Sequence, residues 1–165
     1  MTANLDLFPI GNCAASALID REGRFVWACA PRVDGDPVFG ALLSGGDGGE
    51  ADARGVWSVE LDGGSRAEQA YERNTPVLRT VLRNGAGDAV EIIDLAPRSR
   101  ASGRTYRPNA FIRILRPLSG APRIRIRLRP MADYGARDAE TTFGSNHIRY
   151  VGAGVTQRLT TNGAV

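Results

Sequence analysis

The stretch ALIDREGRFVW, residues 17–27, does most to decide the fold of this chain. Two runs rich in apolar residues flank a polar segment that contains Gly23, and glycine readily adopts the left-handed conformation that closes a short hairpin loop. We therefore expect a strand over residues 17–20, a tight turn, and a second strand over residues 24–27.

A stiff loop is expected directly after this hairpin. The segment PRVDGDP, residues 31–37, has a proline at each end, and proline fixes φ and lacks the N–H that a strand ladder needs. The loop carries Arg32, Asp34 and Asp36. We expect Arg32 to bond with one of the two carboxylates or to point at a partner surface.

The rest of the chain consists mainly of strand patterns separated by turns. Residues 38–43 are expected to form one short helix, which the glycine-rich residues 45–49 end. Residues 97–109 are polar, hold four arginines, and are expected to form an exposed, mobile loop. Six other runs have strand character, and we expect them to pair as three antiparallel hairpins: 56–61 with 67–73, 77–82 with 90–95, and 110–118 with 122–129.

These short strands, together with 20 glycines, predict an all-β fold, a large antiparallel β-sandwich. A chain of 165 residues buries about 70% of its unfolded surface, which suits a single domain over residues 1–165. No apolar run reaches the roughly 18 residues that cross a bilayer, and the N-terminus lacks the basic region of a signal peptide. We therefore expect a cytoplasmic protein with no membrane partner.

All 21 basic residues are arginines, and 18 acidic residues leave a formal charge of +3, which gives little reason to expect a nucleic-acid partner. Over residues 123–129, four arginines alternate with Ile124, Ile126 and Leu128. Because successive strand side chains point to opposite faces, we expect the aliphatic residues in the core and the arginines outside. These arginines either face an acidic partner or, as we favour, form a solvated sheet face neutralised by Glu and Asp across the ladder.

Residues of the types that bind metals most strongly are few and scattered. Cys13 and Cys29 lie on the two arms of the first hairpin, so a contact across the strands is one interpretation. Their spacing matches no redox or zinc motif, and we expect two free thiols. His147 has no second histidine with which to share a metal and is expected on a strand or at the surface. We expect no metal and no cofactor.

An ordered series of short blocks runs through the chain: IGNC at 10–13, DREG at 20–23, WACAPRVD at 27–34, VFGALL at 38–43, Tyr71, NTPVLRT at 74–80, DLAP at 94–97 and RPMADYG at 129–135. Together these blocks resemble the N-terminal domain of bacterial glycoside hydrolase family 15 proteins, the glucoamylase-like and trehalase-like enzymes. The resemblance covers about residues 7–137. The usual sequence of the loop in that family is close to PRFDSP, so Val33, Gly35 and Asp36 depart from it.

The resemblance implies a large antiparallel sandwich, often called a supersandwich, next to a catalytic barrel of paired α-helices. The general acid and base of the family are glutamates of that α/α barrel, for which 165 residues leave no room beside a sandwich. We therefore expect the chain itself to be inert, and the parent protein to perform inverting hydrolysis of α-glucosides such as trehalose or maltooligosaccharides.

The resemblance also suggests where the chain meets its neighbours. The expected partners are the catalytic barrel of the parent and a second copy in a homodimer, with α-glucosides bound only in the parent. A stand-alone carbohydrate-binding or protein-interaction module is the alternative, and an exposed row of Trp and Tyr would favour sugar binding. The candidates for a substrate rim or an interdomain contact are Arg32, Asp34, Asp36, Tyr134 and Arg137.

Overall fold

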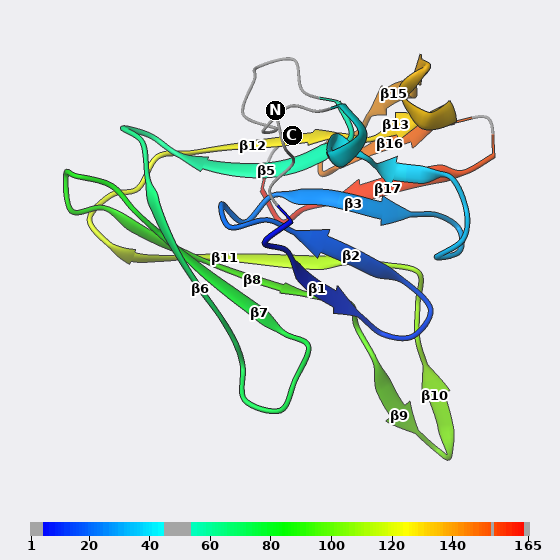
Figure 1. The fold of residues 1–165 in the computed structure, drawn as a ribbon, viewed down its shortest axis with the longest axis horizontal. Coiled ribbons are helices and arrows are strands. Elements are labelled where there is room, and N and C mark those ends of the chain that lie inside the picture. The colour runs from blue at the N-terminus through cyan, green and yellow to red at the C-terminus, as the bar shows by residue number, and fades with distance from the viewer. Residues whose placement is uncertain (1–4, 45–53, 153, 164–165) are drawn as a thin grey trace.

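Two antiparallel β-sheets pack face to face in the computed structural model, which describes residues 5–44, 54–152 and 154–163 (Figure 1). The first sheet has the strand order β1-β2-β3-β5-β12, with β4 paired to β3. Its strands are β1 (Phe8–Gly11), β2 (Ser16–Ile19), β3 (Phe25–Cys29), β4 (Pro37–Phe39), β5 (Val56–Leu61) and β12 (Ile124–Arg129).

The second sheet has the order β11-β8-β7-β6. Its strands are β6 (Arg66–Tyr71), β7 (Leu78–Arg83), β8 (Ala89–Leu95) and β11 (Ile112–Ser119). Val59 and Leu61 of β5 pack against Leu82, Val90 and Ile92 of this sheet, so the two sheets share one core. The predicted all-β sandwich is confirmed.

Smaller elements surround the two sheets. A three-stranded sheet follows near the C-terminal end, and two short pairs of strands complete the described fold. The remaining elements are η1 (Ala41–Ser44), β9 (Ser99–Ala101), β10 (Arg104–Tyr106), β13 (Met131–Ala132), η2 (Asp133–Gly135), β14 (Arg137–Asp138), β15 (Glu140–Phe143), β16 (His147–Val151) and β17 (Thr156–Thr160). No helix in the described ranges is long and apolar enough to span a membrane.

The hairpin expected from residues 17–27 is present as β2 and β3. Gly23 has a φ of +77°, and its N–H donates to the carbonyl of Asp20 at 3.0 Å. The Asp20 carboxylate accepts a hydrogen bond from the backbone N–H of Arg24 at 2.9 Å. It also forms an ion pair with the Arg24 side chain at 2.6 Å. A single aspartate therefore holds both sides of the turn, which confirms this hairpin.

The short helix expected over residues 38–43 is wrong in its first part. Phe39 pairs with Ala28 of β3, so β4 adds to the sheet in place of the expected helical turn. The N–H groups of Gly40 and Ala41 then both donate to the carbonyl of Gly55, which ends the strand and starts the 3-10 helix η1. The expected helix stop at residues 45–49 lies outside the described residues.

Two of the three expected hairpins are also wrong. β7 and β8 do pair, but β5 pairs with β12 and β6 pairs with β7. Likewise β11 pairs with β8 and not with β12. The chain therefore crosses from one sheet to the other at residues 62–65 and again at residues 120–123. A turn signal in the sequence shows a change of direction, but it does not show which sheet receives the next strand.

The edge position of β12 also changes the expected burial of its aliphatic residues. Ile124 and Ile126 pair with Leu61 and Val59, which face the core. They nevertheless remain 37% and 50% exposed. Since β12 is the last strand of its sheet, only one neighbour covers them, and the expectation that they would be core residues is wrong.

A buried ion pair ties the two sheets together. Arg113 of β11 donates to both carboxylate oxygens of Asp94, at 2.7 and 3.0 Å, and their side chains are 2% and 0% exposed. The same guanidinium donates to the carbonyl of Trp57 in β5 and to that of Gly23 in the turn between β2 and β3, and it lies 4.7 Å from the centre of the Phe25 ring. Burial raises the pKa of Asp94, and Arg113 opposes that rise.

Candidate functional site

The loop of residues 31–37 is closed by its own hydrogen bonds. The Gly35 N–H donates to the carbonyl of Arg32 at 3.0 Å. Arg32 Nε and Nη2 each donate to one carboxylate oxygen of Asp34 at 2.9 Å, and these bonds lower the pKa of that carboxyl. The expected local bond of Arg32 is therefore confirmed, and its charge is matched within the loop.

A second segment, formed by β13, η2 and β14, lies beside this loop. Both β13 and η2 contact β4, the strand that begins at the end of the loop. Asp133 and Tyr134 have φ values of 49° and 54°, which fold the chain back so that Arg137 forms an ion pair with Asp133. Tyr134 is 62% exposed.

A cavity of about 280 Å³ separates the two segments. Pro31 and Asp36 line it from the loop, Asp133 lines it from η2, and Gln157 lines it from β17. The fold thus brings residues that are about a hundred positions apart to one place. Of the five candidates from the sequence, Asp36 lines this cavity; the other four, Arg32, Asp34, Tyr134 and Arg137, lie on the two segments beside it but do not line it.

The cavity offers hydrogen-bonding groups in a mostly apolar lining. Asp36, Asp133 and Gln157 can bond to hydroxyl or amide groups, and the volume is slightly below the range usual for small-molecule sites. Burial raises the pKa of Asp94, but this carboxyl is enclosed in the core by Arg113 and cannot reach a substrate. Within the described ranges, no group of His, Cys, Asp and Glu is arranged to hold a metal ion.

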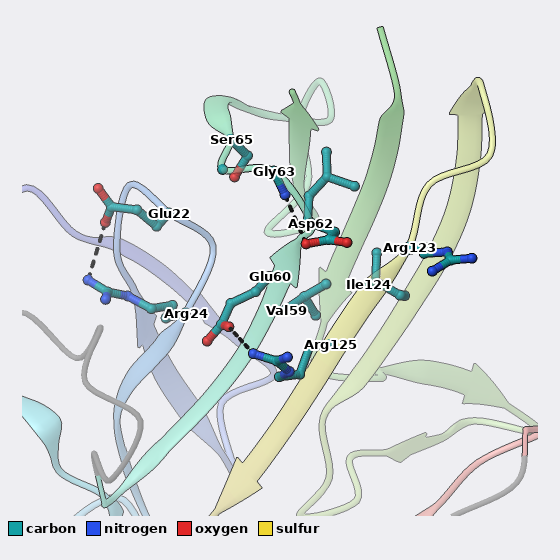
Figure 2. A pocket seen from close by; sticks show the side chains of 12 residues that line it. Glu22, Arg24, Val59, Glu60, Asp62, Gly63, Ser65, Arg123, Ile124 and Arg125 are labelled. Carbon is teal, nitrogen blue, oxygen red and sulfur yellow. Dashed lines mark hydrogen bonds and ion pairs between the residues drawn. The ribbon is translucent and has the colours of Figure 1, made fainter. Parts of the chain in front are cut away.

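A larger hollow of about 500 Å³ lies between the turn that follows β2, the turn that follows β5 and the start of β12 (Figure 2). Charged residues of opposite sign form pairs in this hollow: Arg24 contacts Glu22 at 3.4 Å, and Arg125 contacts Glu60 at 3.9 Å. Glu60 also accepts a hydrogen bond from Arg127 at 2.8 Å. Glu60 therefore pairs with both Arg125 and Arg127 and neutralises part of the charge in the middle of the arginine stripe, which supports the favoured interpretation for these residues.

A projecting β-hairpin replaces the expected mobile loop of residues 97–109. β9 and β10 pair through a two-residue turn at Ser102 and Gly103, whose φ values are 49° and 74° (Figure 1). We call residues 98–107 the arm; all of them are exposed. The Ser-Gly pair between two short runs was the signal that could have predicted this hairpin.

Asn12 clamps the base of the arm. Its amide nitrogen donates to the carbonyls of Pro97 and Pro108, at 2.9 and 2.8 Å, so one side chain bridges the two chain segments that enter and leave the arm. Its amide oxygen accepts the N–H groups of Ala14 and Ala15, both at 2.9 Å. Asn12 is 2% exposed and uses its full hydrogen-bonding capacity, which sequence patterns alone could not reveal.

Comparison with known proteins gives one match. A family model described as "Trehalase-like, N-terminal" matches residues 6–164. No curated protein and no solved structure matches the chain. The match spans nearly the whole sequence, and the structure is the β-sandwich that the sequence blocks implied. The chain therefore belongs to the trehalase-like N-terminal domain family.

Proposed function

We propose that this chain is the non-catalytic N-terminal domain of a trehalase-like member of glycoside hydrolase family 15, and that it braces a catalytic α/α barrel. The observation that carries the proposal is the family match over residues 6–164. The parent enzyme hydrolyses an α-glucoside of the trehalose or maltooligosaccharide type with inversion, using an acid and a base that the barrel supplies. Residence in the cytoplasm and assembly as a homodimer belong to the same proposal.

The two segments around the 280 Å³ cavity are the best candidates for the rim contact with the barrel. Tyr134 is exposed next to the ion pair of Asp133 with Arg137, and the Arg32–Asp34 pair is exposed on the other side. In this proposal the segments present hydrogen-bonding groups to the neighbouring domain, and they take no part in bond cleavage.

The distribution of aromatic residues argues against an independent sugar-binding module. Such modules present neighbouring aromatic rings to the faces of sugars. Here the strongly exposed aromatic residues lie on separate elements, namely Tyr106 on β10, Tyr134 on η2 and Phe143 on β15. Trp27 and Trp57 are both partly buried within the first sheet.

A glucose-release assay tests the proposed role. We expect the purified chain to release no glucose from trehalose, maltose or starch, and to show no binding heat with these sugars in calorimetry. A trehalase assayed in parallel controls for substrate quality. Hydrolysis that follows the chain through a second purification would overturn the proposal, and sugar binding without hydrolysis would favour the carbohydrate-binding module.

A further inference from the structure

We infer that the arm, together with an aliphatic block at its base, is the docking surface for a protein that presents unneutralised carboxylates beside apolar side chains. The aliphatic block consists of Ile93, Leu95, Ile112 and Ile114. The inference rests on the proposed function, because it assigns the catalytic domain of the trehalase-like enzyme as that protein.

The arm is strongly basic. Its ten residues include four arginines and no acidic residue, whereas the other 155 residues hold 17 arginines and 18 acidic residues. The net positive charge of the whole chain therefore lies in the arm. None of these four arginines forms an ion pair within the described part of the chain, in contrast to Arg24, Arg79, Arg113 and Arg127.

The aliphatic block lies at the base of the arm. Leu95 ends β8 and Ile112 begins β11, so these two residues lie where the chain enters and leaves the arm. They pair with each other, and Ile93 pairs with Ile114 in the same ladder. Their neighbours Ile92 and Asp94 face the core with 0% exposure, which places the block on the outer face of the second sheet. Ile112 and Ile114 are 42% and 37% exposed.

The arm is anchored at its base. Asn12 fixes both of its chain segments at the base through the carbonyls of Pro97 and Pro108. Asn109, just beyond the arm, donates to the carbonyl of Pro31 and so links the arm to the loop of residues 31–37. A fixed surface loses less entropy on binding than a flexible one, which favours a role in docking.

The chemistry of the surface distinguishes between possible partners. A cationic hairpin alone could bind phosphate groups, but an aliphatic block has no counterpart on a nucleic-acid backbone, whereas protein interfaces combine an apolar core with a charged rim. A second copy fits less well, because most carboxylates in the described ranges, such as Asp20, Glu60 and Glu91, are already bound to arginines of the same chain. A different protein domain with a carboxylate-rich patch fits both parts.

Calorimetric titration tests this inference. The probe is the catalytic domain of a trehalase-like enzyme, produced as a separate chain and confirmed as helical by circular dichroism. We expect it to bind the wild-type chain, more weakly at 300 mM than at 50 mM NaCl. The variant R100S/R104S/R107S should bind about tenfold more weakly and with a smaller salt dependence. The matched control R123S/R149S/R158S removes the same charge from other exposed positions and should leave the affinity within about twofold.

The aliphatic block has its own matched pair of variants. We expect I112T/I114T to weaken binding by about tenfold, because it removes apolar area and keeps the β-branched shape. The control I124T/I126T makes the same change at residues of similar exposure on β12 and should bind nearly as the wild type does. Circular dichroism and thermal unfolding identify any variant that fails to fold, and a single substitution from the same set, Arg104→Ser for the arm or Ile112→Thr for the block, then replaces it in the comparison.

Each other result has a definite meaning. If the wild type binds and the arm variants bind equally well, or if test and control variants weaken alike, the inference is overturned and the proposed function stands. Binding of a 20-bp DNA duplex, or sedimentation as a dimer, that disappears in the arm variant would overturn the inference in favour of nucleic acid or a second copy. If the catalytic domain does not bind the wild type at all, the proposed function fails as well.

Discussion

Asn12 and Asp94 are both buried polar residues, with 2% and 0% exposure, and both have their hydrogen bonds filled. Burial of such groups is unfavourable unless they are paired. Both residues lie in sequence blocks that carry the family resemblance, so these blocks mark structural contacts. The blocks could be found from the sequence, but the partners could not, because Arg113 and the two prolines bound by Asn12 lie far along the chain.

The link between Arg113 and Asp94 gives a prediction for stability. Replacing Arg113 with Met leaves a buried carboxylate without its partner, and we expect a loss of about 3–5 kcal/mol in the free energy of unfolding, measured by urea denaturation. The double variant D94L/R113M should recover most of that loss because no buried charge remains. Arg125→Met, at an exposed ion pair, is the control and should cost less than about 1 kcal/mol. A loss at Arg113 no larger than this control would contradict the account.

The pair of Arg32 with Asp34 gives a prediction for pH dependence. The hydrogen bonds from Arg32 lower the pKa of Asp34 in the folded protein, so this pair stabilises the loop above the ordinary aspartate pKa and is lost as the pH falls through the folded value. NMR titration of the Asp34 carboxyl carbon should give a pKa below the usual value of about 3.9, and Arg32→Gln should bring it back towards that value. An unchanged pKa in the variant would rule out the pair in solution.

Strands and turns were predicted more successfully than their pairing. The hairpins β2–β3 and β7–β8 follow from alternating patterns around a turn, because both of their strands belong to one sheet. The connections from β5 to β6 and from β11 to β12 pass from one sheet to the other. The pairing of these strands is set by the burial of apolar side chains that lie far apart in the sequence. The expected helix over residues 38–43 began as a strand because β5 pairs with β3 only at Phe25, which leaves the C-terminal part of β3 open for β4.

Gly55 connects three elements of the first sheet and gives a prediction at this scale. Its carbonyl accepts hydrogen bonds from the N–H groups of Gly40 and Ala41, and its own N–H donates to the backbone carbonyl of Arg129. Its φ is +68°. An added Cβ would lie 2.7 Å from the Gly40 nitrogen. We expect Gly55→Ala to be more destabilising than Gly64→Ala, which has a φ of +75° but open space and should cost about 1–2 kcal/mol. Equal losses in thermal unfolding would mean that the close approach at Gly55 is unimportant.

For the molecule as a whole, the sequence predicted the sandwich, and the structure added the cavity and the arm. The five candidate residues lie on two segments that meet at one cavity, which their positions in the sequence did not indicate. The arm was missed because its strands have three residues each and no apolar alternation. The role that we propose for the arm depends on where it projects and on what surrounds its base, and both depend on the folded chain.

The central claim is that this domain supports a catalytic partner and performs no catalysis itself. The most direct measurement heats the separately produced catalytic domain with and without the chain and records its unfolding midpoint and its residual glucose release. A ligand that binds only the native state stabilises it by about 2.7 kcal/mol at a hundred times its Kd, so the account predicts a rise of several degrees at saturation. An unchanged midpoint in the presence of excess chain would contradict it.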